Sequence, residues 1–498
     1  MRERSILRRA TRSFALSALL VTAVLSTDAF GQDPTEDADA DTRHNTTAPN
    51  DAQEQPAPVL SPVTPTPEAV APAPKPKFGD LSVTGYFRGS FGASNQGGRM
   101  TCFGLGNPSG LISKYRLGNE CEVWSETHFT VVTYVGDDGS VASVHVMPTV
   151  YIPNTFIGYS PNGAVNTPAM MATSTGAVLY FPNLYADIKG IPWLGGGTVW
   201  AGTRYYKRES VYISDFFYWN PSGVGAGIED INLGKNLRLS YAAFAIDGEP
   251  GTPPDSTSPP LPNQVDFGVR NDLQLRGIKF WDSGEFQLGF QAIANYSNNP
   301  ATHGGWGATF QFVQQFLGGD NHLAIQYGRG GGTGFGTLAR FYYPDFSINH
   351  DLSEARFRFV DVATIQPIEM IGAQAVFVYQ LDDNFLGNAG LSTAWISTGG
   401  RLAVALSKHF KALGEAGYDQ ITKSNGSPMQ YLAKATGALA ISADRKLYAR
   451  PELRLFYTFA RWNEAARTVG VDSGRIYTNV YPQFLTGSIF GMQVETWW

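Results

Sequence analysis

The stretch that decides the fold is residues 490–498, which reads FGMQVETWW. Its even-numbered positions are mainly apolar, whereas a glutamine, Glu495 and Trp497 fall on the odd-numbered positions. Successive side chains of a β-strand point to opposite faces, so one face of this strand is apolar and the other carries a charge and a ring. Such a strand suits a wall with lipid on one side and water on the other.

Two further stretches, residues 81–91 and 450–459, show the same alternation. In the first, Tyr86 and Arg88 share one parity, and the apolar side chains take the other. Turn-forming joints rich in Gly, Asn, Asp and Ser occur between strand-like stretches, at 136–139, 297–300 and 424–428. The sequence therefore predicts an all-β fold, a transmembrane antiparallel β-barrel over residues 79–498. At about 21 to 26 residues per strand with its connections, this body would hold roughly sixteen to twenty strands around an aqueous channel.

Composition agrees with this class and excludes others. The chain has 498 residues, 55 of them glycine, with 13% aromatic and 16% charged residues and a mean hydropathy of -0.16. These values are typical neither of a helical membrane protein nor of a cytosolic enzyme. The net charge of -6 argues against a nucleic-acid partner. The glycine-rich run at 328–332 lacks the pattern of a phosphate-binding loop, so we expect no nucleotide and no other cofactor.

The N-terminal region has the composition of an export signal followed by a spacer. Residues 1–31 combine a basic start, a short apolar run and a small-x-small exit, as a secretory signal peptide does. Residues 32–78 are first acidic and then proline-rich, which predicts a disordered periplasmic extension with nothing to bury. We interpret it as a flexible tether that reaches toward the cell wall.

The chain has two cysteines, Cys102 and Cys121, and both lie in the exported part. Oxidation is expected there, so the pair indicates one disulfide that pins a loop. Two cysteines without clustered histidines do not suit a zinc site, and we expect no metal.

Residues 200–219, WAGTRYYKRESVYISDFFYW, are rich in both rings and charges. This mixture is too charged for a buried core strand, and it suits a surface that stacks a flat polyhydroxylated molecule. The alternative is a strand with an interfacial aromatic belt followed by a solvated loop.

Taken with its neighbours, this stretch resembles the maltoporin family of outer-membrane sugar porins. The resemblance rests on an ordered set of motifs: Gly85-Tyr86-Phe87-Arg88, residues 113–122, Trp200-Ala201-Gly202-x-Arg204-Tyr205-Tyr206, residues 215–219, Arg450-Pro451, and Glu495-x-Trp497-Trp498. It implies an eighteen-stranded barrel, a homotrimer in the outer membrane of a Gram-negative-type cell, and passive passage of linear glucose oligomers. It also implies a loop that folds inward and constricts the pore.

In that family an aromatic slide runs beside a polar track. Matched by position, the slide includes Tyr86, Trp124, Tyr448 and Trp497, and the track includes Arg88, Arg116, Glu126, Arg208 and Asp215. The paired cysteines of the family match Cys102 and Cys121. The residues themselves also allow a purely structural interpretation, in which the aromatic residues form an interfacial belt and the charged residues form a ladder on the inner wall. Shared parity with Arg88 and Glu126 favours the lumen for Tyr86 and Trp124, because charges on the lipid face are costly.

The chain departs from the family at the constriction. Ser210, Tyr212 and Phe217 replace a more polar set, and the slide phenylalanine falls on Ala308. Phe310 keeps the parity of Ala308, and we expect it to substitute in the slide.

The sequence is compatible with three functions. The first is a porin for maltose and maltodextrins, and the second is a porin for other sugars or general small solutes. The third is an exported carbohydrate-binding or hydrolytic β-protein, in which Glu126 and Asp215 would serve as the two carboxylates. We favour a porin and expect no enzyme activity.

Overall fold

The computed structural model describes residues 76–98, 100–105, 115–153, 178–247, 267–335, 348, 350–384, 389–469, 481 and 483–498. The predicted signal peptide and nearly all of the predicted extension lie outside the described residues.

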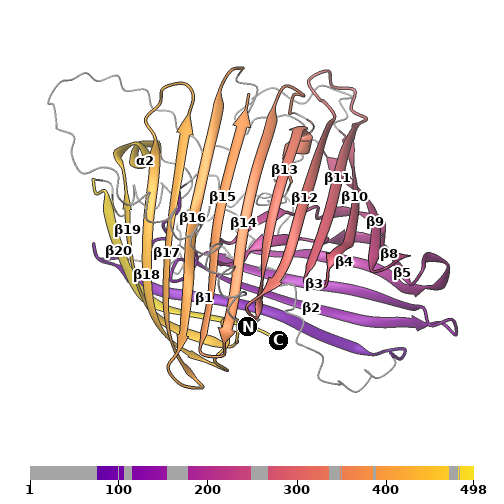
Figure 1. Cartoon of the computed structure of the whole chain (residues 1–498), viewed down its shortest axis with the longest axis horizontal. Coiled ribbons are helices and arrows are strands. Elements are labelled where there is room, and N and C mark those ends of the chain that lie inside the picture. Colours follow the sequence, from indigo (N-terminus) through magenta and orange to yellow (C-terminus); the bar gives the residue numbers. More distant parts are fainter. Residues whose placement is uncertain are drawn as a thin grey trace, which may run out of the picture. The chain divides into compact units, whose positions relative to one another are not determined.

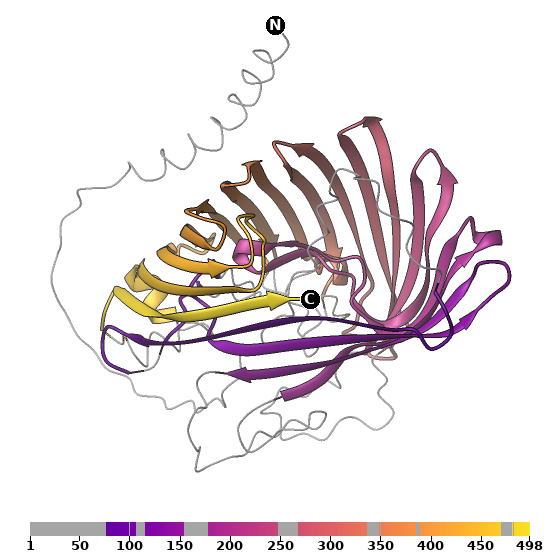
Figure 2. The ribbon, with the colours of Figure 1, turned by 90° about the horizontal axis from the view of Figure 1, so that it is seen from below.

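In this described part, 18 strands form one sheet in which each strand pairs with its neighbours in an antiparallel sense. β1 pairs with both β2 and β20, so the sheet closes into a barrel (Figures 1 and 2). The prediction of an antiparallel barrel of about 18 strands is confirmed. The barrel strands are β1 (Leu81–Ser94), β2 (Glu122–Val135), β3 (Val141–Pro153), β4 (Val178–Ile191), β5 (Gly197–Arg204), β8 (Gly223–Gly234), β9 (Leu237–Asp247), β10 (Phe267–Trp281), β11 (Gly284–Asn295), β12 (Gly305–Phe316), β13 (Gly319–Gly330), β14 (Ala355–Ile368), β15 (Ile371–Asp383), β16 (Ser392–Ala405), β17 (Phe410–Lys423), β18 (Gln430–Ser442), β19 (Glu452–Trp462) and β20 (Thr486–Trp497).

The connections between strands differ at the two ends of the barrel. Because the strands are antiparallel, alternate connections lie at the same end. At one end, which we call the short-turn end, they include the two-residue turns 235–236, 282–283 and 317–318. Residues 443–451, between β18 and β19, form a longer connection at this same end.

Helical structure in the described residues is confined to the connections between strands, at both ends of the barrel. The 3₁₀ helices are η2 (Pro192–Leu194), η3 (Tyr212–Ser214) and η4 (Gly331–Thr333), and the α-helix is α2 (Glu464–Val469). Across the described ranges, no helix combines the length and the apolar character needed to cross a membrane.

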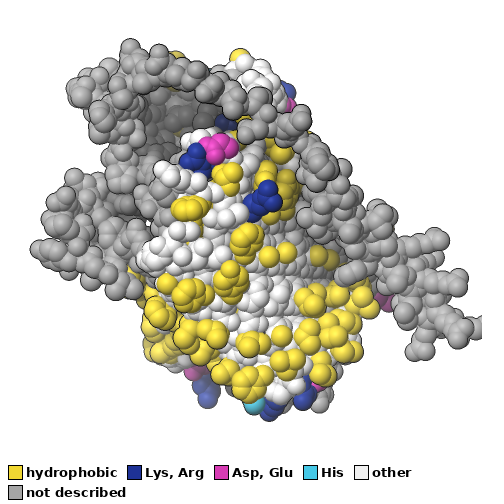
Figure 3. Space-filling model, turned by 90° about the vertical axis from the view of Figure 1, so that its left-hand side faces the viewer, with side chains coloured by type: hydrophobic (Ala, Val, Ile, Leu, Met, Phe, Trp, Pro, Cys, Tyr) yellow, Lys and Arg dark blue, Asp and Glu magenta, His cyan; other side chains and the backbone are white. Residues whose placement is uncertain are grey.

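The two faces of the strands differ as their sequences predict. On β19, Leu455 and Tyr457 are 61% and 55% exposed, whereas Glu452 and Arg454 are each 1% exposed. Figure 3 shows a band of hydrophobic side chains on the outer surface, with charged side chains at its lower rim. The barrel therefore turns an apolar face outward and buries charged groups inside, where they pair with one another.

The last residue of the chain packs on the outside of the closing strand pair. The backbone N–H of Trp498 donates to the carbonyl of Gly85 at 3.1 Å, and the Gly85 N–H donates back at 3.0 Å. A Cβ on Gly85 would lie 2.2 Å from the Trp498 ring, so glycine leaves room for the indole. Trp498 is 54% exposed, as a ring in the aromatic girdle of a membrane barrel would be.

Candidate functional site

The segment between β5 and β8 folds into the barrel, as predicted. It contains a small hairpin of β6 (Glu209–Val211) and β7 (Phe216–Trp219), and η3 forms its tip. All four residues of β7 are buried. Figure 2 shows this part of the chain crossing inside the ring of strands. We call residues 205–222 the inward loop.

Hydrogen bonds fix the inward loop to the wall formed by β12–β15. The Tyr218 hydroxyl donates to Gln311 Oε1 at 2.8 Å, and Arg358 Nη1 donates to the Tyr218 carbonyl at 3.2 Å. Near the tip, the Ile213 N–H donates to Gln374 Oε1 at 3.0 Å. The loop is thus held from one side along its length.

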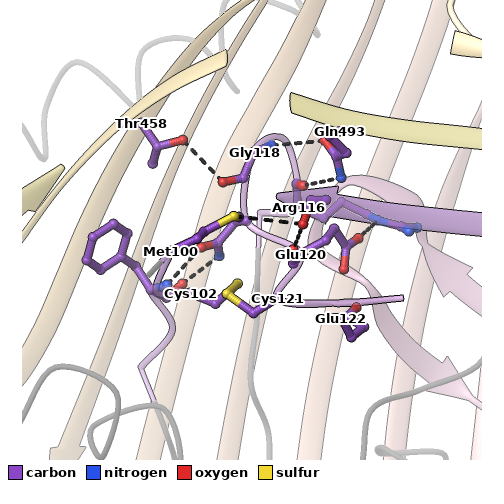
Figure 4. Close-up of a disulfide and its surroundings, with 12 residues drawn as sticks. Met100, Cys102, Arg116, Gly118, Glu120, Cys121, Glu122, Thr458 and Gln493 are labelled. Carbon is purple, nitrogen blue, oxygen red and sulfur yellow. Dashed lines mark hydrogen bonds and ion pairs between the residues drawn. A yellow bond between two sulfur atoms is a disulfide. The ribbon is translucent and has the colours of Figure 1, made fainter. Parts of the chain in front are cut away.

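A second segment, Tyr115–Cys121, also folds inward and meets the tip. The Arg116 N–H donates to the Ile213 carbonyl at 2.8 Å. The Leu117 N–H donates to Glu415 at 2.8 Å, and the Gly118 N–H donates to Gln493 at 3.1 Å (Figure 4). The narrowing is therefore built from two loops that contact each other.

The ring of Tyr115 anchors this second segment against two glycines of the wall. A Cβ on Gly399 would lie 2.3 Å from the Tyr115 ring, and one on Gly417 would lie 2.1 Å from it. The Tyr115 hydroxyl lies 2.9 Å from Ser397 Oγ. Only glycine at both wall positions allows the ring to lie this close to the strands.

Cys102 and Cys121 form the predicted disulfide at the base of the second segment (Figure 4). Asn119 reinforces it, because its side chain accepts from the Phe103 N–H and donates to the Phe103 carbonyl, each at 2.7 Å. The disulfide and this amide together join the two halves of the connection between β1 and β2.

The four aromatic residues predicted for the slide all contact other rings inside the barrel. Tyr86 stacks on Trp497, with ring centroids 6.5 Å apart and planes 14° from parallel. Trp124 meets Tyr151 at 6.0 Å and Tyr180 at 5.6 Å in edge contacts. The fourth, Tyr448 in 443–451, accepts a hydrogen bond from Gln374 at 2.8 Å and packs on the tip of the inward loop. Sequence reasoning missed Tyr151 and Tyr180.

Three residues predicted for the polar track meet in one cluster of ion pairs. Arg88 pairs with Glu122 at 2.6 Å, Asp215 at 3.3 Å and Glu120 at 3.4 Å. Arg116 pairs with Glu120 at 2.5 Å and with Asp215 at 3.8 Å. Asp215 has a left-handed backbone, with φ of 55°, just after the tip of the loop. The loop geometry therefore brings its carboxylate between two arginines of other segments.

Arg208, Glu126 and Phe217 form a second group beside this cluster, and Asp215 interacts with both Arg208 and Glu126. The Arg208 guanidinium lies over the Tyr205 ring at 3.5 Å and over the Phe217 ring at 4.9 Å. Burial lowers the pKa of Arg208, and Tyr205 and Glu126 offset this only in part. Glu126 is 6% exposed on β2. This arrangement places a cation among rings, with a carboxylate close enough to interact.

Glu495 on β20 is a charged centre that sequence reasoning did not include among the site residues. Its carboxylate accepts from the Tyr86 hydroxyl at 2.9 Å and pairs with Arg454 at 2.7 Å. It also pairs with Arg450 at 2.8 Å and with Arg116 at 3.3 Å. One carboxylate thus balances three arginines from three different segments.

The prediction that Phe310 lines the pore is wrong. Its neighbours Thr309 and Gln311 are 5% and 0% exposed, and Gln311 bonds to the inward loop through Tyr218. Side chains alternate along β12, so Phe310 lies on the outer face, where it is 37% exposed and packs against Phe286 at 5.2 Å.

Comparison with known proteins assigns the class of this barrel. The model of the LamB porin family matches residues 81–498, and the chain belongs to this family. It is also similar to solved structures at low identity. OccAB1 of Acinetobacter baumannii has a TM-score of 0.43 and 11% identity, over 84% of this chain and 97% of that one. OccK8 (OprE) of Pseudomonas aeruginosa has a TM-score of 0.42 and 10% identity, over 84% and 98%. OpdK of Pseudomonas aeruginosa, solved with vanillate, has a TM-score of 0.41 and 8% identity, over 84% and 99%.

The protein is therefore an outer-membrane β-barrel porin for sugars or other small solutes, and its family is one of transport channels rather than of enzymes. In such barrels the short turns face the periplasm and the longer loops face outward, so the short-turn end is periplasmic. The carboxylate of Asp215, considered above with Glu126 as a hydrolytic pair, is engaged in ion pairs with Arg88 and Arg116.

Proposed function

We propose that this porin passes maltose and maltodextrins by facilitated diffusion. The observation that carries the proposal is the stack of Tyr86 on Trp497, 6.5 Å between centroids, beside the cluster in which Asp215 pairs with Arg88 and Arg116. The C–H faces of a glucose ring pack on aromatic rings, and its hydroxyls bond to charged groups at the ring edges. Rings and charges side by side match both requirements.

Passage follows from the weakness of each contact. Trp497 and Tyr448 are half-buried, so each offers only part of its ring to a solute. Conduction through a selective pore needs binding that is favourable enough for entry and weak enough for exit. A series of shallow, similar ring contacts lets an oligosaccharide advance from one ring to the next.

A second candidate is a porin for other sugars or for small solutes in general. It is supported by the two apolar or aromatic substitutions in the inward loop, Tyr212 and Phe217, both of which are buried. A constriction with fewer free polar groups offers fewer partners for the hydroxyls of a long maltodextrin.

Planar-bilayer conductance separates the two candidates. The purified channel is titrated with maltohexaose and, in parallel, with sucrose. The first proposal expects maltohexaose to reduce the ion current at millimolar concentrations and sucrose to do so less well. Absence of block by maltohexaose would leave only the second candidate.

We also propose that the chain assembles as a homotrimer and that residues 32–78 form a periplasmic tether that contacts the cell wall. The resemblance to maltoporins supports the first, and the proline-rich composition supports the second. Migration of the unheated protein as a trimer that dissociates on heating tests the oligomeric state. Co-sedimentation of a residue 32–78 peptide with purified peptidoglycan tests the tether.

A further inference from the structure

Tyr212, at the tip of the inward loop, is surrounded by three guanidinium groups. The Cζ atom of Arg116 lies 5.0 Å from the centre of its ring, that of Arg401 lies 5.2 Å away, and that of Arg450 lies 5.7 Å away. These arginines come from the second inward segment, from β16 and from 443–451. Tyr212 is 2% exposed. Its ring therefore fills the space where three segments and the loop tip converge.

The hydroxyl of Tyr212 connects the loop tip to the wall. It donates to Glu495 Oε2 and accepts from Arg450 Nη2. Burial by itself lowers the pKa of Arg450, but its interactions with Tyr212 and Glu495 outweigh this and raise the pKa above its ordinary value. The inward loop is thus fixed at its tip as well as along its side.

The ring of Tyr212 also stands against two of the rings assigned to the slide. It meets Tyr448 edge-on at 5.2 Å and 88°, and Trp497 at 6.5 Å and 88°. An edge contact of this kind occupies surface that a flat solute would need for stacking. Tyr212 therefore lies between Tyr448 and Trp497 and covers part of each.

We propose that Tyr212 is a specificity-determining residue that sets the size of the solute admitted. Its ring closes the space between the loop tip, β20 and 443–451, and it interrupts the row of rings between Trp497 and Tyr448. The part of the proposal in which Tyr212 narrows the pore requires only that the protein is a porin. The part in which Tyr212 interrupts the aromatic slide rests on the proposed function. The solute class favoured by this arrangement is a short sugar that fits on one side of Tyr212.

Single-channel conductance in salt without sugar tests the narrowing. Because the proposal places the ring of Tyr212 at the edge of the conducting path, Tyr212→Ala is expected to raise the conductance by roughly 1.5-fold or more. Tyr212→Phe keeps the ring and is expected to stay close to the unmodified channel. Tyr212→Leu, which keeps an apolar side chain in the packed space, is expected to lie between the two.

Tyr218 provides the matched control. It lies in the same loop and is 1% exposed, but its hydroxyl bonds to Gln311 on the wall behind the loop. Tyr218→Ala therefore removes an equal ring away from the tip, and its conductance is expected to change less than that of Tyr212→Ala. Each variant is first checked for heat-modifiable migration and a β-sheet circular dichroism spectrum.

Two results would overturn the proposal. One is an unchanged conductance in both Tyr212→Ala and Tyr212→Leu in folded channels. The other is an equal rise in Tyr218→Ala, which would assign the effect to general loosening of the loop. Block by maltohexaose, measured on the same channels, separates failure of this proposal from failure of the proposed function. Failure to block the unmodified channel and Tyr212→Ala alike counts against the proposed function and leaves the conductance test of the narrowing intact.

Discussion

Replacing Glu495 with glutamine tests whether the charged centre stabilises the barrel. Glu495 is 1% exposed, and its carboxylate pairs with Arg454 at 2.7 Å, Arg450 at 2.8 Å and Arg116 at 3.3 Å. Glu495→Gln keeps an oxygen that accepts hydrogen bonds, but it removes the negative charge that balances these three cations.

The expected loss of stability follows from the burial of the Glu495 carboxylate. Removing one partner of a buried ion pair costs about 3–5 kcal/mol, because the remaining charge stays buried without compensation. Glu452 still pairs with Arg454 at 2.6 Å and with Arg450 at 3.7 Å, which limits the loss. We therefore expect the free energy of unfolding to fall by about 3 kcal/mol, the lower end of that range.

The assay is equilibrium urea unfolding of the barrel in lipid vesicles, followed by tryptophan fluorescence. Glu369→Gln is the control, because Glu369 pairs with Arg445 at 3.1 Å and the two side chains are 71% and 41% exposed. Loss of such a surface pair costs about 0–1 kcal/mol. If Glu495→Gln destabilised the barrel no more than Glu369→Gln does, the reasoning from burial would be refuted.

Four further predictions concern the pore and its loops. Trp497→Ala is expected to raise the dissociation constant for maltohexaose about three- to tenfold, the value of one ring contact, and to change the open conductance less. Equal losses would make the role of Trp497 structural. Phe310→Ala is expected to leave the block by sugar unchanged because the side chain faces outward. Weaker block would indicate that Phe310 lines the lumen. Gly417→Ala places a Cβ 2.1 Å from the Tyr115 ring, so we expect a lower urea midpoint and noisier open-channel current. Deletion of residues 33–77, which precede β1, is expected to leave conductance intact, and a closed channel would contradict the tether.

Alternation within single strands was sufficient to predict which faces of β1, β19 and β20 look inward. Arg88, Arg454 and Glu495 share parity with inward rings, and all three are buried at 1% or less. The same reasoning would have found Tyr151, because residues 141–153 alternate between apolar even positions and an odd face that carries His145 and Tyr151.

Parity fails where the strand is irregular, and the match to the family misleads where it disagrees with parity. In β4 a register shift opposite Met147 and Thr149 inserts an extra residue, so Tyr180 and Tyr185 both reach the interior although their numbers differ in parity. In β12 the even face carries Phe310 and the other rings, and the odd face carries Thr309 and Gln311, so parity alone places Phe310 outside. The match to the family places it in the slide, and the contact of Gln311 with Tyr218 identifies the odd face as the inner one.

The sequence by itself determined the barrel, its apolar outer face and most of the side chains that face the lumen, because these depend on a two-residue period within each strand. Only the tertiary structure decided which of these side chains meet. Tyr212 and Glu495 are 283 residues apart, and Arg88 and Asp215 are 127 residues apart. Such contacts depend on barrel closure and on how far each loop reaches inward, and no local pattern in the chain encodes either.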